Sequence, residues 1–223
     1  MDKNYEFLIH EIKNNVTLLQ SSLQLIKKKH PEIKNYTEWN IIDIAFTDLS
    51  HLFETVSQKK TISELNMSIQ PINNILTSFE THTQQLCSNA ELPAPIFEHT
   101  ITDYSSLSVS MNISLLERAL LNLVQNAIDA MNGSASKTLL VRTYYDNKTQ
   151  QFGISITDSG IGISKEFLNL IYTPSFTTKD NGLGFGLCIV KEIITAHNGI
   201  LLCDSIVNQG TTFTILLPIE YQS

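Results

Sequence analysis

The chain has 223 residues, of which 42% are hydrophobic and 17% are charged, so it can build one large or two small globular cores. The formal net charge of −7 argues against a nucleic-acid partner, because nucleic-acid binding needs a basic surface that displaces counterions from phosphates. No apolar run approaches the roughly 20 residues of a membrane span, and the three cysteines are far apart, which indicates a reducing compartment; we expect a cytoplasmic chain without a transmembrane segment.

The apolar periodicity of residues 5–58 predicts two long amphipathic helices that meet at Pro31. In each segment, apolar residues recur at steps of three and four and form one stripe along a helix. The two stripes are Leu8, Ile12, Val16, Leu19, Leu23 and Ile26, and then Trp39, Ile42, Phe46, Leu49, Phe53 and Val56. Further apolar residues, such as Ile41 and Leu52, stay uncovered in a single hairpin. We therefore predict that residues 1–61 form a helical hairpin that makes a homodimer through a four-helix bundle.

Residues 62–223 are predicted to form a second domain. Helical and strand periodicities are mixed here without strict alternation, which favours an α+β two-layer sandwich over a doubly wound sheet. The predicted helices lie at 72–86, 115–131, 165–172 and 185–197, and the predicted strands at 96–101, 139–145, 152–157, 200–205 and 211–218.

Glycines gather in two short segments of this second domain. Five of the nine glycines fall between Gly160 and Gly186, in the sequences DSGIGI at 158–163 and GLGFGL at 182–187. Glycine lets the backbone approach a phosphate closely and adopt torsions that other residues avoid. The second segment also opens a predicted helix, whose free N–H groups would point at phosphates. The clusters predict a phosphate-binding pocket, although a flexible loop is the alternative for a bare Gly-x-Gly-x-Gly.

Polar residues next to the glycines have chemistry that suits a nucleotide. Asp158 follows an apolar strand, so its carboxylate can accept from a purine amino group; a turn aspartate is the alternative. Asn122 and Asn126 lie one helical turn apart with Asp129 close to the same face, and together they can converge on a metal ion that bridges phosphates. Taken singly, each asparagine could equally be a solvated or capping residue.

Residues 65–220 resemble the catalytic ATP-binding domain of sensor histidine kinases, because four of their segments match the motifs of that domain in content and in order. LNLVQNAIDA at 121–130 resembles the asparagine box of that family, and DSGIG at 158–162 resembles its adenine-binding box. TPSFTTK at 173–179 resembles its phenylalanine box, and residues 181–187 resemble its phosphate-binding box. The ending GTTFTILLP at 210–218 resembles its last strand.

The resemblance implies ATP and Mg²⁺ as cofactors. It implies that Asn126 binds Mg²⁺, that Asp158 takes the adenine amino group, and that residues 173–184 form a mobile lid. The predicted nucleotide-binding residues are Asn122, Asn126, Asp158, Gly160, Gly162, Thr178, Lys179, Gly182, Gly184, Gly186 and Leu187. Where many family members carry a basic residue this chain has Asp129, which leaves Lys179 as the nearest candidate cation.

One position of the asparagine box bears on the type of reaction. The same pocket fold serves gyrase-type and chaperone ATPases and the serine kinases that regulate sigma factors. Those relatives usually have a glutamate general base four residues before the metal-binding asparagine, but here that position is Asn122, which cannot take a proton. We therefore expect the base elsewhere in the chain.

The N-terminal sequence LIHEIKN at 8–14 resembles the phosphoacceptor box of histidine kinases. His10 lies on the polar side of its predicted helix, where it can act as a neutral imidazole nucleophile, and Glu11 can fix its tautomer. By resemblance, Asn14 would orient water for the reverse, phosphatase activity. An ordinary surface histidine and a solvated asparagine are the alternatives. Asn15 and Val16 replace the usual proline and leucine, which bears on domain orientation.

The sequence thus predicts a two-component histidine kinase that phosphorylates His10 from ATP and passes the phosphoryl group to an aspartate of a response regulator. His10 lies close to Met1, so we expect the signal from a separate sensor protein, unless the chain is a fragment. Two alternatives stay open. One is a phosphotransfer or scaffold protein that does not use ATP, and the other is a serine kinase or ATPase with the same pocket.

Overall fold

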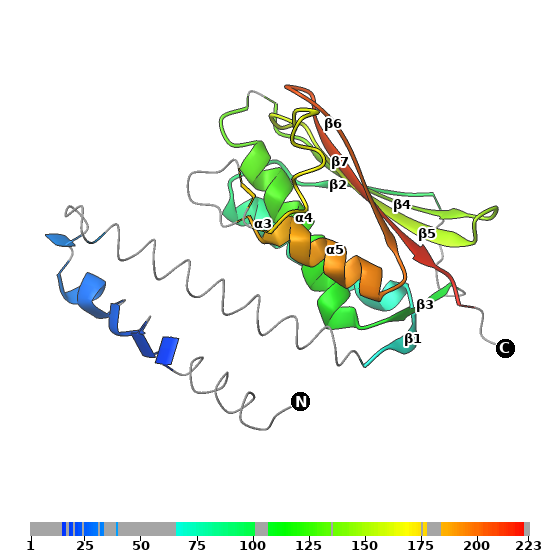
Figure 1. Ribbon diagram of the computed structural model, residues 1–223, viewed down its shortest axis with the longest axis horizontal. Coiled ribbons are helices and arrows are strands. Elements are labelled where there is room, and N and C mark those ends of the chain that lie inside the picture. Colours follow the sequence, from blue (N-terminus) through cyan, green and yellow to red (C-terminus); the bar gives the residue numbers. More distant parts are fainter. Residues whose placement is uncertain are drawn as a thin grey trace. The chain divides into compact units, whose positions relative to one another are not determined.

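The structure is a computed structural model of the chain (Figure 1). It describes residues 15–16, 18–19, 21–23, 25–30, 32–33, 39, 66–100, 107–134, 136–174, 176–177 and 184–220. The described residues from 66 to 220 form one compact unit, and those from 15 to 39 belong to another. None of the described helices is both long and apolar enough to cross a membrane.

The described residues of the first unit agree in part with the predicted hairpin. Those between 15 and 29 are helical, and a 3₁₀ turn follows at 32–33. Val16 and Trp39 of the predicted apolar stripes are buried, whereas Leu19 and Ile26 are 49% and 39% exposed in the single chain. His10, Glu11 and Asn14 lie outside the described residues. The hairpin as a whole and the four-helix bundle stay predictions.

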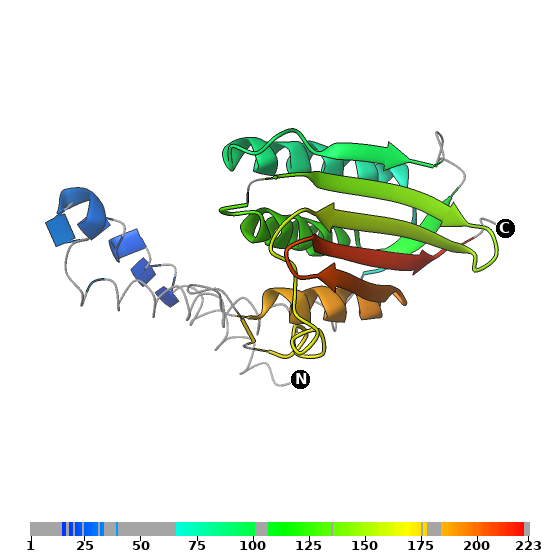
Figure 2. The ribbon, with the colours of Figure 1, turned by 90° about the horizontal axis from the view of Figure 1, so that it is seen from above.

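The second unit is built on a mixed five-stranded sheet. Its strands are β2 (Ile96–His99), β4 (Leu139–Asp146), β5 (Gln151–Asp158), β7 (Gly210–Pro218) and β6 (Ile200–Ile206), in that spatial order. β2 runs parallel to β4, and the other neighbours are antiparallel. Figure 2 shows these strands side by side. The parallel β2 pair gives the sheet its mixed character.

Three helices cover one face of this sheet, as Figure 1 shows. They are α3 (Asn73–Asn89), α4 (Ile113–Ala130) and α5 (Gly186–Ala196), and α4 packs against both of the others. A small antiparallel pair, β1 (Ser68–Pro71) and β3 (Ser108–Met111), forms a separate two-stranded sheet. The second domain is therefore an α+β two-layer sandwich, as predicted.

The sequence analysis was wrong in two local details of this domain. Residues 165–172 are predicted as a helix but form successive turns, in which the N–H groups of Phe167 and Leu170 donate to the carbonyls of Ser164 and Phe167. β3 has no counterpart among the predicted strands, because its four residues are too few for a pattern of period two to stand out.

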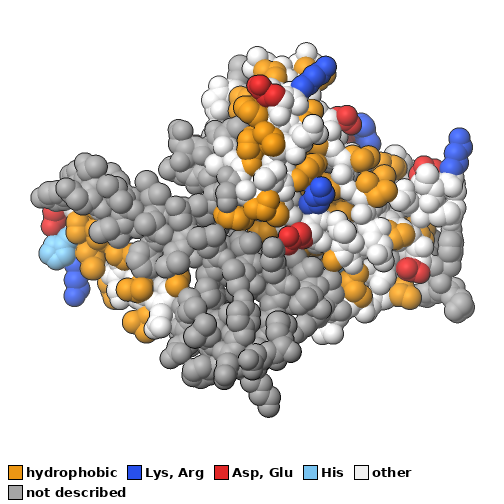
Figure 3. Space-filling view, viewed as in Figure 1, with side chains coloured by type: hydrophobic (Ala, Val, Ile, Leu, Met, Phe, Trp, Pro, Cys, Tyr) orange, Lys and Arg blue, Asp and Glu red, His pale blue; other side chains and the backbone are white. Residues whose placement is uncertain are grey.

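The apolar core lies between the sheet and α4. Leu116, Leu120 and Leu123 recur at steps of three and four on α4 and are at most 1% exposed. They face a sheet surface to which β5 and β7 contribute alternate residues such as Ile154 and Ile215, each 1% exposed. The side chain of Asn112 caps the start of α4 by accepting from the N–H of Leu115. On the described surface seen in Figure 3, hydrophobic side chains are scattered among uncharged polar groups and a few charged side chains.

The buried side chain of His197 connects the end of α5 to the start of α4. His197 follows α5, is 1% exposed, and its Nδ1 lies 2.7 Å from the carbonyl oxygen of Ile193. Its Nε2 accepts the backbone N–H of Asn112 at 3.0 Å, just before α4. Because a carbonyl only accepts and an N–H only donates, these contacts select the neutral imidazole with its proton on Nδ1. His197 therefore has a structural role.

We predict that His197→Ala lowers the free energy of unfolding by about 2–4 kcal/mol, because it leaves the Asn112 N–H without its acceptor and opens a cavity. His82→Ala is the control, since the His82 side chain is 50% exposed, and it should cost less than about 1 kcal/mol. Urea denaturation of the full chain measures both values. Equal losses for the two variants would contradict this role of His197.

Candidate functional site

The predicted pocket residues come from three elements that meet in the structure. Asn122 and Asn126 lie on α4, Asp158 is the last residue of β5, and Gly186 is the first residue of α5. α4 packs against both β5 and α5. The fold therefore brings together segments that are far apart in the sequence, around the face of α4 that carries the asparagines.

The two asparagines form a pair beside the start of α5. The Nδ2 of Asn126 donates to the Oδ1 of Asn122 at 3.3 Å, and both side chains are half-buried. Gly186 packs closely on this pair, because a Cβ at that position would lie 2.8 Å from the Oδ1 of Asn122. The start of α5 thus lies next to the Asn122 amide, which in turn is bonded to Asn126, a combination that suits a metal–phosphate group.

Asp158 is a buried carboxyl at the end of an apolar strand. It is 5% exposed, and its Oδ1 accepts the backbone N–H of Gly160 at 2.7 Å. Burial raises the pKa of Asp158, and hydrogen bonds from the backbone N–H groups of Gly160 and Thr211 oppose that rise. The bond to Gly160 is an Asx turn, so the local turn role and a ligand-binding role are compatible.

The glycine loop 158–163 is held between the end of α4 and the hairpin of β6 and β7. The N–H of Ile161 donates to the carbonyl of Ala130 at 3.0 Å, and a Cβ at Gly160 would lie 2.5 Å from that same carbonyl oxygen. Gly162 has φ +67°, and a Cβ there would overlap the carbonyl oxygen of Ile206. Both glycines are therefore required by close backbone contacts and, at Gly162, by a left-handed conformation.

Just before α5, Gly184 lies against the backbone of Phe176. A Cβ at Gly184, which has φ +70°, would overlap the carbonyl oxygen of Phe176. The ring of Phe176 in turn lies 5.4 Å from that of Phe167. Leu187 is half-buried in the first turn of α5. The predicted residues Thr178, Lys179 and Gly182 lie outside the described residues.

The sequence analysis missed Thr211 and Ser205. Thr211 pairs with Asp158 in the sheet and is 4% exposed, and Ser205 pairs with Thr211. In β7 the positions that face the helices are Thr211, Phe213, Ile215 and Leu217. Thr211 could have been identified from the sequence, because it is a polar residue at a core-facing position of a strand whose other core-facing residues are apolar.

Neither Cys203 nor Tyr172, which lie near this site, is a nucleophile at neutral pH. Burial, with a smaller effect of Asp204 and Asp158, raises the pKa of Cys203 to about 12. Burial also raises the pKa of Tyr172 to about 12. Both groups stay protonated at pH 7.

Among the described residues, no group of three or more His, Cys, Asp and Glu side chains could hold a metal ion.

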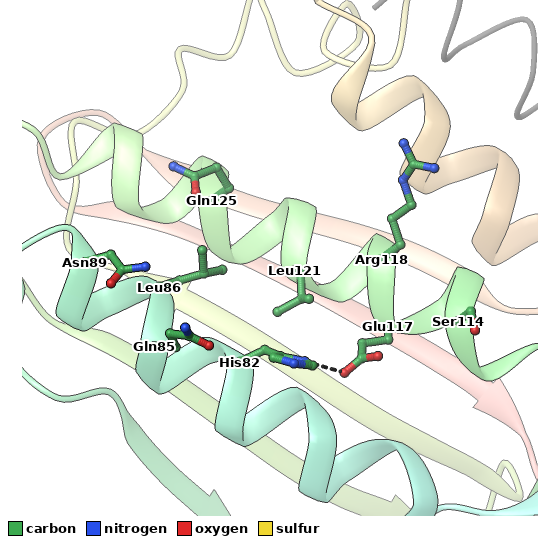
Figure 4. Close-up of a pocket in the computed structure, with 9 residues that line it drawn as sticks. All are labelled: His82, Gln85, Leu86, Asn89, Ser114, Glu117, Arg118, Leu121 and Gln125. Carbon is green, nitrogen blue, oxygen red and sulfur yellow. Dashed lines mark hydrogen bonds and ion pairs between the residues drawn. The ribbon is translucent and has the colours of Figure 1, made fainter. Parts of the chain in front are cut away.

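A separate groove with a volume of about 590 Å³ lies between α3 and α4 (Figure 4). It does not include the predicted pocket residues. His82 lies 2.9 Å from the Oε1 of Glu117, and Ser78 donates to that same oxygen. Because the Ser78 hydroxyl donates its one proton to the carboxylate and lies 3.5 Å from the Nδ1 of His82, these three residues are not arranged to activate a nucleophile.

Comparison with known proteins names the family of the second unit. Residues 111–221 match the model of the histidine kinase-, DNA gyrase B- and HSP90-like ATPases. This segment belongs to that ATPase family. The match covers α4, β5 and α5, and so all of the described pocket residues fall inside the ATPase domain.

Relatives match most of the chain, including residues before the ATPase domain. The sensor histidine kinase ZraS of Salmonella typhi is 28% identical over 211 residues, which are 94% of this chain and 44% of that protein. The mycobacterial sensor histidine kinase MprB is a solved structure with 26% identity and a TM-score of 0.56, covering 70% of this chain and 99% of that one. The chain spans about half the length of the first curated relatives it matches.

A further solved structure is similar in fold to this chain. Full-length ShkA in complex with AMPPNP has a TM-score of 0.68 and 16% identity, and the likeness covers 99% of this chain and 46% of ShkA. At this identity the likeness concerns the fold alone.

We predict that Gly162→Ala lowers the free energy of unfolding by about 2 kcal/mol more than Gly133→Ala does. Both glycines have positive φ, but a Cβ at Gly133 meets nothing within 4 Å, whereas one at Gly162 overlaps backbone. The comparison therefore separates the steric contact from the cost of a left-handed conformation. Urea denaturation measures it, and equal losses would mean that the loop moves away from Ile206 without cost.

We predict that Asp158→Asn becomes more stable relative to wild type as the pH rises from 4.5 to 7.5. Because burial raises the pKa of Asp158 in the folded chain, wild type loses stability as the pH rises from the ordinary carboxyl range through that raised pKa, and the substitution removes this loss. Asp146→Asn is a control whose stability relative to wild type should not change across this range, since hydrogen bonds from Lys148 and Thr149 lower the pKa of Asp146 and the group is already ionised there. Urea denaturation across this pH range tests both, and parallel curves for the two variants would contradict the assignment.

Proposed function

We propose that this chain is a histidine protein kinase whose ATPase domain binds ATP with Mg²⁺ and phosphorylates His10. The observation that carries the proposal is the meeting of Asp158, the asparagine pair and the glycine-flanked start of α5 within one ATPase-family fold. Relatives named as histidine kinases match the chain well beyond that domain, and this supports the kinase over other members of the pocket family.

The base of the nucleotide would lie against Asp158. Its carboxylate is held by two backbone N–H groups and presents remaining lone pairs at the end of β5. A carboxylate that is desolvated and fixed in place is a strong acceptor for an exocyclic amino group. The AMPPNP complex of ShkA, which shares the fold, is consistent with an ATP-like ligand in this kind of domain.

The triphosphate would lie between the asparagine pair and α5. The N-terminal N–H groups of α5 and the positive end of its dipole favour negative charge, and Gly184 and Gly186 let the Phe176 backbone and the Asn122 side chain pack closely against the start of the helix. Thr178, Lys179 and Gly182 would belong to the loop that covers them.

Asn126 is the residue that would hold Mg²⁺, beside Asn122. The donor set fits this ion, because Mg²⁺ takes few protein ligands and completes its shell with water and phosphate oxygens. Amide oxygens are hard ligands of the required type. The ion would neutralise charge on the phosphates. The chain's own contribution is to orient the amide oxygen, and the hydrogen bond between the two asparagines does this.

The reaction itself would use the first unit. A lone pair of the neutral His10 imidazole attacks the γ-phosphorus, a nitrogen–phosphorus bond forms, the bond to the bridging oxygen breaks, and ADP leaves. Glu11 would fix the tautomer of His10 and stabilise the positive charge that develops on the ring. The phosphoryl group would then pass to an aspartate of a response regulator, and Asn14 would orient water in the reverse, phosphatase reaction.

A homodimer would complete the first unit. Leu19 and Ile26 belong to the predicted apolar stripe and are partly exposed in the single chain. Exposed apolar residues at helical spacing are the usual sign of a face that another helix covers. A second copy of the hairpin supplies such a face, and a separate sensor protein would deliver the signal.

We predict that wild type incubated with γ-labelled ATP and Mg²⁺ incorporates label that acid removes and alkali does not, as expected for phosphohistidine. His10→Ala should reduce incorporation to background, a loss of about 10³-fold or more for a nucleophile. His30→Ala is the matched control, because His30 is an exposed histidine in the same unit, and it should leave labelling unchanged.

Other outcomes of this experiment identify the alternatives. Label that persists in His10→Ala would overturn the assignment of the phosphoacceptor, and a phosphoserine product would indicate a serine kinase. Steady phosphate release without label would indicate an ATPase. Absence of ATP binding by wild type would favour a phosphotransfer or scaffold protein.

A further inference from the structure

Polar side chains cross three neighbouring strands at one end of the sheet. The register pairs Asp158 of β5 with Thr211 of β7, and Thr211 with Ser205 of β6. The next row toward the middle of the same face is Ile156, Phe213 and Cys203, and the row after that is Ile154, Ile215 and Leu201. Buried polar groups at this depth are costly unless each finds a partner, so the contacts of the polar row are informative.

The Ser205 hydroxyl contacts three other groups. Its Oγ lies 2.7 Å from the backbone nitrogen of Ile163, 3.0 Å from the carbonyl oxygen of Gly210 and 2.9 Å from the Oγ1 of Thr211. Ile163 ends the glycine loop, whereas Gly210 and Thr211 begin β7. Ser205 therefore ties the glycine loop to the strand that lies beside Asp158.

The number of available protons fixes the direction of each of these hydrogen bonds. A hydroxyl has one proton to donate and two lone pairs that accept. The Gly210 carbonyl only accepts, so it takes the Ser205 proton. The two lone pairs of Ser205 then accept from the Ile163 N–H and from the Thr211 hydroxyl. Thr211 has used its only proton, so its oxygen can meet a ligand only as an acceptor.

We propose that Ser205 is a positioning residue that makes the base pocket selective for a nucleobase with an amino group. The proposal rests on the proposed function, since it places the base of a nucleotide against Asp158 and Thr211. Two acceptors side by side favour an exocyclic amino group, as in adenine, and repel a carbonyl oxygen, as in guanine. Ser205 acts by keeping the Thr211 proton turned away from the ligand.

Loss of the Ser205 hydroxyl would change the pocket in two ways. The Thr211 hydroxyl would be able to turn its proton toward the ligand and donate to a carbonyl oxygen as readily as it accepts from an amino group. The Ile163 N–H would lose its acceptor, so the end of the glycine loop would be held less firmly. The first change alters selectivity between bases, and the second weakens binding of any nucleotide.

The test is calorimetric titration of the full chain with ATP and with GTP in the presence of Mg²⁺. The variants are Ser205→Ala, Ser205→Thr and Thr212→Val. Ser205→Ala should reduce the ratio of GTP to ATP dissociation constants by about five- to twentyfold, as expected for one hydrogen bond of this kind. Ser205→Thr keeps the hydroxyl and should keep the ratio within about twofold of wild type.

Thr212→Val is the matched control. Thr212 lies on the same strand as Thr211 but on the opposite face, where its hydroxyl contacts that of Thr157 at 2.9 Å. The Thr212→Val substitution removes a hydrogen-bonded hydroxyl from the same sheet but changes none of the contacts of Asp158, Thr211 and Ser205. The ratio of GTP to ATP dissociation constants should therefore stay at the wild-type value.

A double-mutant cycle separates positioning from a general loss of stability. If Ser205 acts through Thr211, then Ser205→Ala added to Thr211→Val should leave the ratio of GTP to ATP dissociation constants as it is in Thr211→Val alone. The amide proton of Ile163 should also exchange faster with solvent in Ser205→Ala. Should Ser205→Ala not fold, Ser205→Cys gives the same comparison, because a thiol is a weak donor and acceptor of similar size.

Two failures can be told apart in these titrations. If wild type binds neither ATP nor GTP, the proposed function itself is wrong. If wild type binds ATP and Ser205→Ala discriminates against GTP equally well, the role of Ser205 is wrong and the proposed function stands. A fall in the ratio with Thr212→Val as large as that with Ser205→Ala would also overturn the role of Ser205.

Discussion

The structure around the candidate site depends on one costly feature, a carboxyl group buried at the end of β5. Burial raises the pKa of Asp158, so the fold must supply donors that hold its charged form. One donor is the N–H of Gly160 in the glycine loop, and the other is the N–H of Thr211 in β7. Loop and strand are thereby fixed relative to the carboxyl, and backbone packs so closely there that a Cβ at Gly210 would overlap the carbonyl oxygen of Asp158.

Helix α4 is the second element on which the site depends. Its apolar stripe, with Leu116, Leu120 and Leu123, anchors it to the sheet, and this fixes the direction in which the asparagines at 122 and 126 point. Its last residues hold the glycine loop through the carbonyl of Ala130. α5 begins against the asparagine pair. One well-packed helix therefore sets the separation between the three parts of the pocket, so the packing of α4 in the core determines where the pocket residues lie.

Much of this arrangement could be predicted from the sequence, for reasons that differ between elements. α4, β5 and β7 are long and strictly periodic, so their type was clear, and Asp158 and the asparagines were found because they follow or interrupt those patterns. The turns at 165–172 were predicted as a helix because the spacing of apolar residues alone cannot distinguish successive turns from a continuous helix. Ser205 was missed because its importance comes from cross-strand register, which joins positions that a single sequence does not connect.

The central claim is that the pocket beside Asp158 binds ATP, and calorimetric titration of Mg²⁺·ATP into wild type and Asp158→Asn tests it most directly. The account predicts saturable binding at one site per chain in wild type. It also predicts an affinity at least about tenfold weaker in the variant, because the amide replaces a fixed carboxylate acceptor with a group that has fewer lone pairs and no charge. Equal affinity of the two proteins for ATP would place the nucleotide elsewhere and contradict the account.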